Sequence, residues 1–155
     1  MIANVTPDLS SEWDQGKLRA WMANAKRLKR NDVYQEAFRQ LCRIEGHDLD
    51  DPLAAEFAGV MRALEEALTE EAEKTKRLSR TRQKLKRAGV RQTLADLALK
   101  PQPSVGFLKL IEFGMADMSA ESLILKYRTE FEATVVDAAR ARLKQYGVAP
   151  DAAKL

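Results

Sequence analysis

A basic block at residues 74–91 holds the side chains whose type and spacing point most directly to chemistry. The preceding residues 51–73 carry seven acids and one base, and the flanks 1–50 and 92–155 are each neutral. Like charges in one block repel each other, and a polyanion would offset that cost because neutralisation releases its condensed counterions. The block therefore predicts contact with nucleic-acid phosphates. It has nine bases and no acid: Lys74, Lys76, Arg77, Arg80, Arg82, Lys84, Lys86, Arg87 and Arg91.

Part of this block resembles a helix-turn-helix. In the segment LKRAGVRQTLADLA, a first helix would end at Ala88, Gly89 would form the bend, and a second helix would follow. The resemblance covers residues 79–99 and implies a second helix that touches base edges. It departs from the motif at Ala95, where a branched apolar residue is usual, and at the acid Asp96. The candidate nucleic-acid-binding residues are Arg77, Arg80, Arg82, Lys84, Lys86, Arg87, Arg91 and Gln92.

Duplex DNA is the expected partner of the basic block. No aromatic residue occurs between Phe57 and Phe107, so the block has no local platform on which unpaired bases could stack. The alternative is a protein-protein interaction or regulatory module, in which the block binds an acidic protein surface or the acidic block of a second chain in a homodimer. Pairing within one chain would require a reversal near Leu78 and Ser79, and a plain solvated charged face also stays open.

Enzymatic chemistry is not expected from this sequence. It contains one histidine, His47, and one cysteine, Cys42, so neither a zinc ligand set nor most catalytic constellations can be assembled. The acids between His47 and Pro52 are explained as caps of the following helix, and Cys42 as a buried structural thiol. There is no phosphate-binding glycine loop, nucleophile elbow or dinucleotide fingerprint, so we predict no cofactor and no metal site.

The sequence also favours a cytoplasmic protein. Its single cysteine cannot form an internal disulfide, and its first residues lack the basic flank and apolar stretch of a secretory signal. No window approaches 18 uninterrupted apolar residues, which predicts that the chain does not span a membrane.

Composition predicts an all-α fold. The chain has 155 residues, 45% of them hydrophobic, with only 7 glycines, 5 prolines and 6% aromatic residues, a poor composition for a many-turned β-sandwich. We expect one compact multi-helix domain over residues 1–155, with frayed ends at about 1–9 and 149–155. Hydrophobic periodicity suggests about seven or eight helices.

The expected helices are placed by caps and by apolar spacing. A first helix at 11–29, capped by Ser10 or Ser11, and a second ending at Gly46 form a hairpin, and a long central helix starts at Pro52. A second hairpin spans 79–99, a final helix 132–146, and the run at 122–127 could be a helix or a strand. The predicted core comprises Leu18, Trp21, Phe38, Leu41, Phe57, Val60, Leu64, Phe107, Ile111, Val136 and Leu143.

Overall fold

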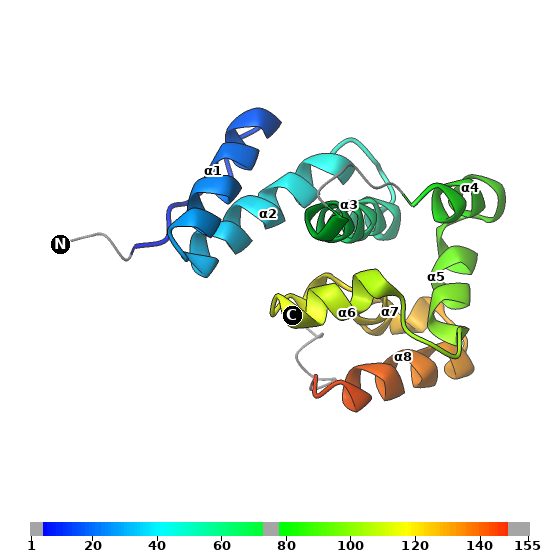
Figure 1. Ribbon diagram of the computed structural model, residues 1–155. Coiled ribbons are helices and arrows are strands. Elements are labelled where there is room, and N and C mark those ends of the chain that lie inside the picture. Colours follow the sequence, from blue (N-terminus) through cyan, green and yellow to red (C-terminus); the bar gives the residue numbers. More distant parts are fainter. Residues whose placement is uncertain (1–4, 73–77, 149–155) are drawn as a thin grey trace.

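A computed structural model of the protein describes residues 5–72 and 78–148, and all regular structure in these ranges is helical (Figure 1). The expectation of an all-α, multi-helix fold is therefore confirmed. None of the helices in these two ranges is long and apolar enough to cross a membrane. The helices are α1 (Gln15–Arg27), α2 (Asn31–Gly46), α3 (Pro52–Ala72), α4 (Ser79–Ala88), α5 (Val90–Leu99), α6 (Val105–Glu112), α7 (Ala120–Lys126) and α8 (Ala133–Gln145), with short 3₁₀ turns η1 (Ala116–Met118) and η2 (Arg128–Glu130).

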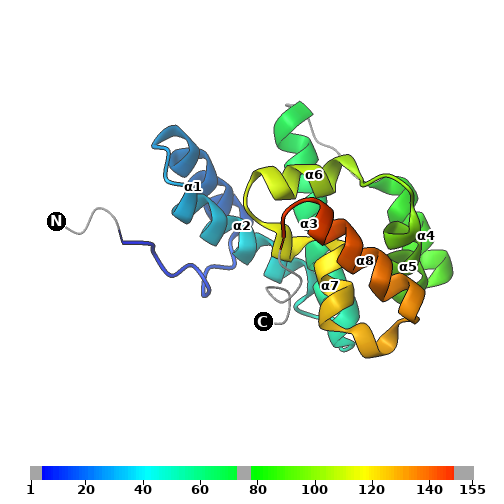
Figure 2. The ribbon, with the colours of Figure 1, turned by 90° about the horizontal axis from the view of Figure 1, so that it is seen from below.

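Two groups of helices pack against each other through α3. The first group is α1 to α3, in which α2 packs on both of its neighbours, and the second is α6 to α8, which lies below it in Figure 1. The central helix α3 contacts α5, α6 and α7 and so joins the two groups. The hairpin α4–α5 lies at one edge of the molecule, where α5 also packs on α7 and α8 (Figures 1 and 2).

Helix boundaries follow the caps, with one correction at the start. The first helix is capped by Asp14, whose carboxylate accepts a hydrogen bond from the Lys17 amide at 3.1 Å, and it begins after the predicted Ser10 and Ser11. The segment 122–126 is helical and belongs to α7, which Ser119 caps by accepting from the Ser122 amide, and Tyr127 follows as the C-cap. Gly89 separates α4 from α5 with φ of 90° and ψ of 169°, a backbone conformation open almost only to glycine.

The predicted core is largely confirmed, and Trp21 is the error. Of the eleven predicted core residues, nine are buried and Ile111 is partly buried, whereas Trp21 is 40% exposed. On α1 the buried column is Leu18, Met22 and Ala25, at spacings of four and three. Trp21 lies beside that column and faces outward. Trp13, just before α1, is also exposed.

Close backbone packing fixes the crossing of α2 and α3. A Cβ atom on Gly46 would lie 2.1 Å from the Ala55 carbonyl oxygen, so only glycine permits this approach. Asp51 accepts a hydrogen bond from the Leu53 amide at 3.2 Å, which confirms its predicted capping role. Cys42 is buried at the same crossing, and burial raises the pKa of its thiol to about 12, as expected for a structural cysteine.

A buried ion pair fixes the end of α5 against α8. Arg142 donates to Glu121 Oε2 and to the Leu97 carbonyl, both at 3.2 Å, and to the Lys100 carbonyl. The arginine thus satisfies carbonyl groups that the last turn of α5 leaves without helical partners. Both side chains are buried, and desolvation raises the pKa of Glu121 despite the opposing effect of Arg142.

We predict that the two partners of this pair respond unequally to substitution. Arg142→Met should lower the free energy of unfolding by about 3 to 5 kcal/mol, because it leaves the Glu121 carboxylate buried without its cation. Glu121→Gln should cost less, since it removes the charge that burial disfavours. Because the pKa of Glu121 is raised on folding, protonation favours the folded state, and the Arg142→Met deficit should shrink as the pH falls. Urea unfolding at pH 7 and pH 5 measures both effects, and equal, pH-independent costs would contradict the prediction.

Candidate nucleic-acid interface

The basic helix α4 lies on the surface and buries none of its residues. Its apolar contact with the core comes from Leu85 and the preceding Leu78, both only partly buried. So little apolar contact cannot hold a ten-residue helix in place, because isolated helices of this length are marginal in water. The position of α4 must therefore depend on polar interactions with its neighbours.

The strongest of these interactions is an ion pair between α4 and α3. Glu65 is buried, and its carboxylate accepts hydrogen bonds from Arg82 Nε at 2.7 Å and Arg82 Nη2 at 2.5 Å. The same carboxylate accepts from the Leu78 amide at 2.8 Å, just before α4 begins. The Glu65 carboxylate raises the pKa of the Arg82 guanidinium. This bidentate contact attaches the start of α4 to the central helix.

Further charges extend this pair across the first three helices. Glu45 on α2 lies 3.9 Å from Arg82 and 3.6 Å from Arg62 on α3. Arg62 Nε donates to Glu66 at 2.9 Å, and Glu66 also accepts from Arg19 on α1 at 3.2 Å. Positive and negative groups alternate along the whole series, so each charge has an opposite charge beside it. The charged residues of α3 thus contribute to the packing of α1, α2 and α4.

Two other predicted site residues are bound within the α4–α5 hairpin. Lys84 forms an ion pair with Asp96 on α5, and Gln92 Nε2 donates to the same carboxylate at 2.9 Å. Lys84, and to a lesser extent Gln92, lower the pKa of Asp96. The acid that departs from the helix-turn-helix pattern therefore has a structural use, because it joins the two helices of the hairpin.

Arg91, at the start of α5, is bound by acids that lie outside the α4–α5 hairpin. Its Nε donates to Glu130 in η2 at 2.9 Å, and its Nη1 lies 3.5 Å from Asp51. Glu130 is the main cause of the raised pKa of Arg91. Four of the eight predicted site residues, Arg82, Lys84, Arg91 and Gln92, are thus engaged by carboxylates of this chain.

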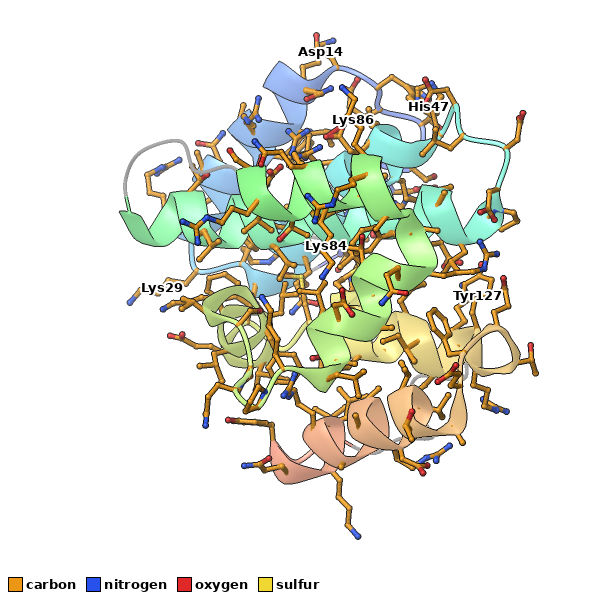
Figure 3. All side chains as sticks on the ribbon, turned by 90° about the vertical axis from the view of Figure 1, so that its right-hand side faces the viewer. Asp14, Lys29, His47, Lys84, Lys86 and Tyr127 are labelled. Atoms are coloured by element: carbon orange, nitrogen blue, oxygen red, sulfur yellow. The ribbon has the colours of Figure 1, made fainter. Side chains whose placement is uncertain are left out.

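Three of the remaining four residues form a separate exposed set. Arg80, Lys86 and Arg87 are exposed, and no carboxylate in the described part of the chain pairs with them. Figure 3 shows Lys86 on the side of α4 away from α5, whereas Lys84 lies on the side that faces α5. The fourth residue, Arg77, lies outside the described residues. We call Arg80, Lys86 and Arg87 the α4 ridge.

The second helix of the hairpin is largely occupied by packing. Thr93, Leu94 and Ala98 are buried on the side of α5 that meets the rest of the protein. Arg91 and Gln92 are exposed in the first turn of α5. In helix-turn-helix proteins this part of the recognition helix contacts base edges. Both side chains already have partners, so base contact by α5 would require those partners to be exchanged.

The His47 side chain makes its contacts within the chain. The His47 ring contacts the Ile44 carbonyl through Nδ1 at 2.7 Å and the Trp13 ring at a centroid distance of 4.8 Å. Within residues 5–72 and 78–148, no group of three or more His, Cys, Asp or Glu side chains is arranged to hold a metal ion. Asp51, one of the acids near His47, caps α3 through its hydrogen bond with the Leu53 amide.

The carboxylate partners were not identified from the sequence. Glu65, Asp96 and Glu130 lie 17, 12 and 39 residues from the bases they bind. The one available signal was the reversal considered near Ser79, which would bring the basic block back onto the acidic one. The structure shows such a return for Glu65 and Arg82.

We predict that loss of the Arg82 contact loosens α4. Arg82→Met should cost about 3 kcal/mol in the free energy of unfolding, because the Glu65 carboxylate stays buried. It should also speed amide hydrogen exchange in α4. The matched control is Arg80→Met, which removes an exposed arginine of the same helix and should stay within about 0.5 kcal/mol of the wild type. Adding Glu65→Gln to Arg82→Met should recover part of the loss, and equal effects of the two methionine substitutions would contradict the assignment.

Comparisons with known proteins identified no relative: no protein-family model matches the chain, and no curated protein or solved structure matches it.

Proposed function

We propose that the protein binds nucleic acid, with duplex DNA as the expected form, by contacting the phosphate backbone through the α4 ridge. The observation that carries the proposal is the division of bases on one helix. Arg82 and Lys84 attach α4 to the body of the protein, whereas Arg80, Lys86 and Arg87 are exposed without a carboxylate partner in the described part of the chain. A helix held by some cations and presenting others is suited to a polyanion.

The spacing of the ridge fits a phosphate backbone. Arg80 and Arg87 are seven residues apart, about 10 Å along a helix that rises 1.5 Å per residue. One DNA strand carries a charge about every 3.4 Å along the helix axis, so the ridge can meet several phosphates at once. The whole of α4 has five bases and no acid, so no negative side chain on this helix opposes the approach of DNA.

Phosphate contact is better supported than base reading. The α4 ridge needs no rearrangement, whereas Arg91 and Gln92 on α5 are bound to Glu130 and Asp96. Phosphate contacts set the position of a protein on DNA and give affinity without reading sequence. The proposal is therefore a nucleic-acid-associated protein with strong salt dependence, in which sequence preference is secondary.

The first test is charge reversal of the ridge. The triple variant Arg80→Glu, Lys86→Glu, Arg87→Glu should abolish binding to a labelled duplex in fluorescence anisotropy. Wild-type affinity should fall steeply between about 50 mM and 200 mM salt, with a log-log slope near −0.9 for each phosphate neutralised. Parallel titrations with single-stranded DNA and RNA would show which form is preferred.

The matched control makes the same change of charge elsewhere. Lys17→Glu, Arg27→Glu and Lys144→Glu replace three exposed bases on α1 and α8 and should leave most of the affinity intact. Equal losses in the two triple variants would indicate a general effect of net charge. Absence of binding to mixed DNA and RNA pools at about 50 mM salt would reject the proposal.

Self-association through the acidic and basic blocks is the competing function. The contact between Glu65 and Arg82 satisfies part of that pairing within one chain, which weakens the need for a second copy. We therefore expect the wild type to sediment as a monomer at tens of micromolar. A dimer that the ridge triple variant dissociates would favour the interaction role instead.

A further inference from the structure

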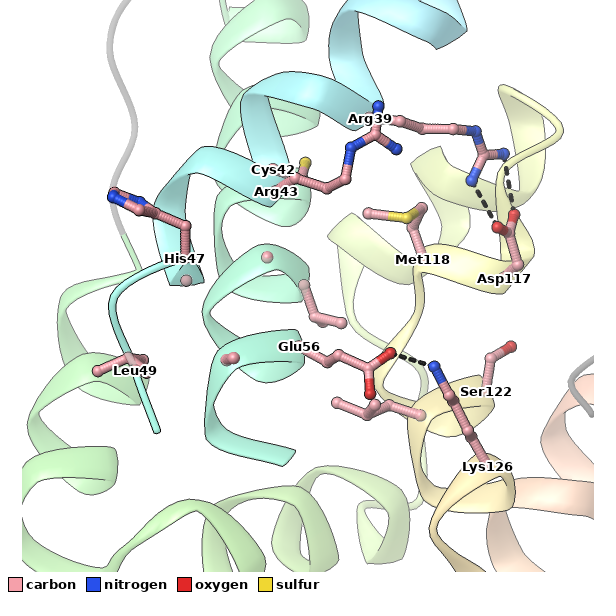
Figure 4. Close-up of a pocket in the computed structure, with 15 residues that line it drawn as sticks. Arg39, Cys42, Arg43, His47, Leu49, Glu56, Asp117, Met118, Ser122 and Lys126 are labelled. Atoms are coloured by element: carbon pink, nitrogen blue, oxygen red, sulfur yellow. Dashed lines mark hydrogen bonds and ion pairs between the residues drawn. The ribbon is translucent and has the colours of Figure 1, made fainter. Parts of the chain in front are cut away.

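A groove opens between the two groups of helices and is separate from the α4 ridge. Its volume is about 730 Å³, and it lies between α2 and α3 on one side and η1 and α7 on the other (Figure 4). Volumes of about 300 to 1,000 Å³ are typical of small-molecule sites. None of its lining residues belongs to α4 or α5.

Small residues create the floor of this groove. Gly46, Ala55 and Gly59 line it, and they contribute almost no side-chain volume. A Cβ on Gly46 would clash with the Ala55 carbonyl, and one on Gly59 would lie 3.3 Å from the Cys42 carbonyl oxygen, closer than an ordinary contact. Val60, Leu123 and Met118 add apolar surface. The floor therefore suits an apolar body.

Two ion pairs cross the groove and fix its width. At one end, Arg39 on α2 makes a bidentate contact with Asp117 in η1, at 2.5 and 3.0 Å. At the other end, Glu56 on α3 accepts from Lys126 Nζ and from the Tyr127 hydroxyl. Glu56 raises the pKa of Tyr127 to about 12, so this hydroxyl stays a donor. Each end is thus locally neutral, and neither needs a ligand.

Arg43 is the one charged lining residue of the groove that belongs to neither of the two ion pairs. Its Nε donates to Gln40 Oε1 at 2.8 Å, but its terminal Nη2 lies 3.5 Å from Glu36 Oε1, too far for a strong hydrogen bond. Its side chain is 51% exposed, and Figure 4 shows it extending from α2 on the side of the groove where Met118 lies. The bases and acids that line the groove leave one net positive charge, with Arg43 as its source.

We propose that this groove binds a small organic monoanion with an apolar body, such as an aliphatic carboxylate. The apolar chain would lie on the floor between Ala55 and Leu123, and the carboxylate would accept hydrogen bonds from the Arg43 guanidinium, which matches it in geometry. A ligand with an ammonium group in place of the carboxylate would be repelled by the positive charge of Arg43. The site shares no residue with the α4 ridge, so it stands or falls independently of nucleic-acid binding.

Decanoate is the probe for this site, and decylammonium, which has the same chain length and the opposite charge, is the control ligand. Protein labelled with ¹³C at the methionine methyl groups reports the location of binding, because Met118 lines the groove whereas Met22 is buried on α1. Titration with decanoate should shift the Met118 signal in a saturable manner and leave Met22 unchanged. Decylammonium should bind more weakly by at least about tenfold, as expected for loss of a charge-assisted hydrogen bond.

The key variant is Arg43→Glu, and the chain offers a close control. Arg140 on α8 has similar exposure, 47% against 51%, and the same 3.5 Å separation from an acid, Asp137. Arg43→Glu should weaken decanoate binding at least about tenfold, whereas Arg140→Glu should leave it unchanged. Circular dichroism verifies the fold of each variant, and Arg43→Gln replaces Arg43→Glu if the latter unfolds.

Three results would overturn the inference. One is that decanoate leaves Met118 unmoved, and another is that it shifts Met22 as strongly, which would indicate detergent-like binding. The third is that both arginine variants, or both probes, give the same affinity. A tenfold preference that depends on Arg43 alone would establish the site.

Discussion

The position of the basic helix depends on one buried carboxylate. Glu65 accepts hydrogen bonds from the Leu78 amide and from two nitrogens of Arg82, and α4 buries no residue of its own. An ionised carboxylate is stable in the interior only when charge and hydrogen bonds compensate it. The same requirement that stabilises Glu65 therefore determines where α4 lies, and with it the direction in which the α4 ridge points.

The opposite charges of residues 51–73 and 74–91 consequently have two separate explanations. One part is used within the fold, where Glu65 and Glu66 bind arginines from α4, α3 and α1. The other part, the α4 ridge, has no such partner in the described ranges and retains its self-repulsion in the free protein. The charge asymmetry of the sequence therefore combines two kinds of residue: those that form ion pairs within the fold and those that are exposed on the surface.

The sequence predicted local structure well and long-range pairing poorly. Asp51 and Gly89 mark helix ends as predicted, because a cap acts on amides a few residues away, and Phe57 and Leu64 follow from helical spacing. Trp21 shows the limit of spacing alone, since it lies three residues after Leu18 and four before Ala25 but is not buried with them. Pairing between Arg82 and Glu65 depends on the reversal between helices, which no local pattern specifies.

The two proposed sites make different use of arginine, and the difference follows from their surroundings. The cations of the α4 ridge have no carboxylate partner in the described residues, so their effect is long-ranged and weakened by salt, as suits a polyanion of uniform charge. In the groove most charges are neutralised across its width, and a single guanidinium stands beside an apolar floor. There the geometry of one hydrogen-bonding group matters more than the total charge, which favours a small ligand with one anionic end.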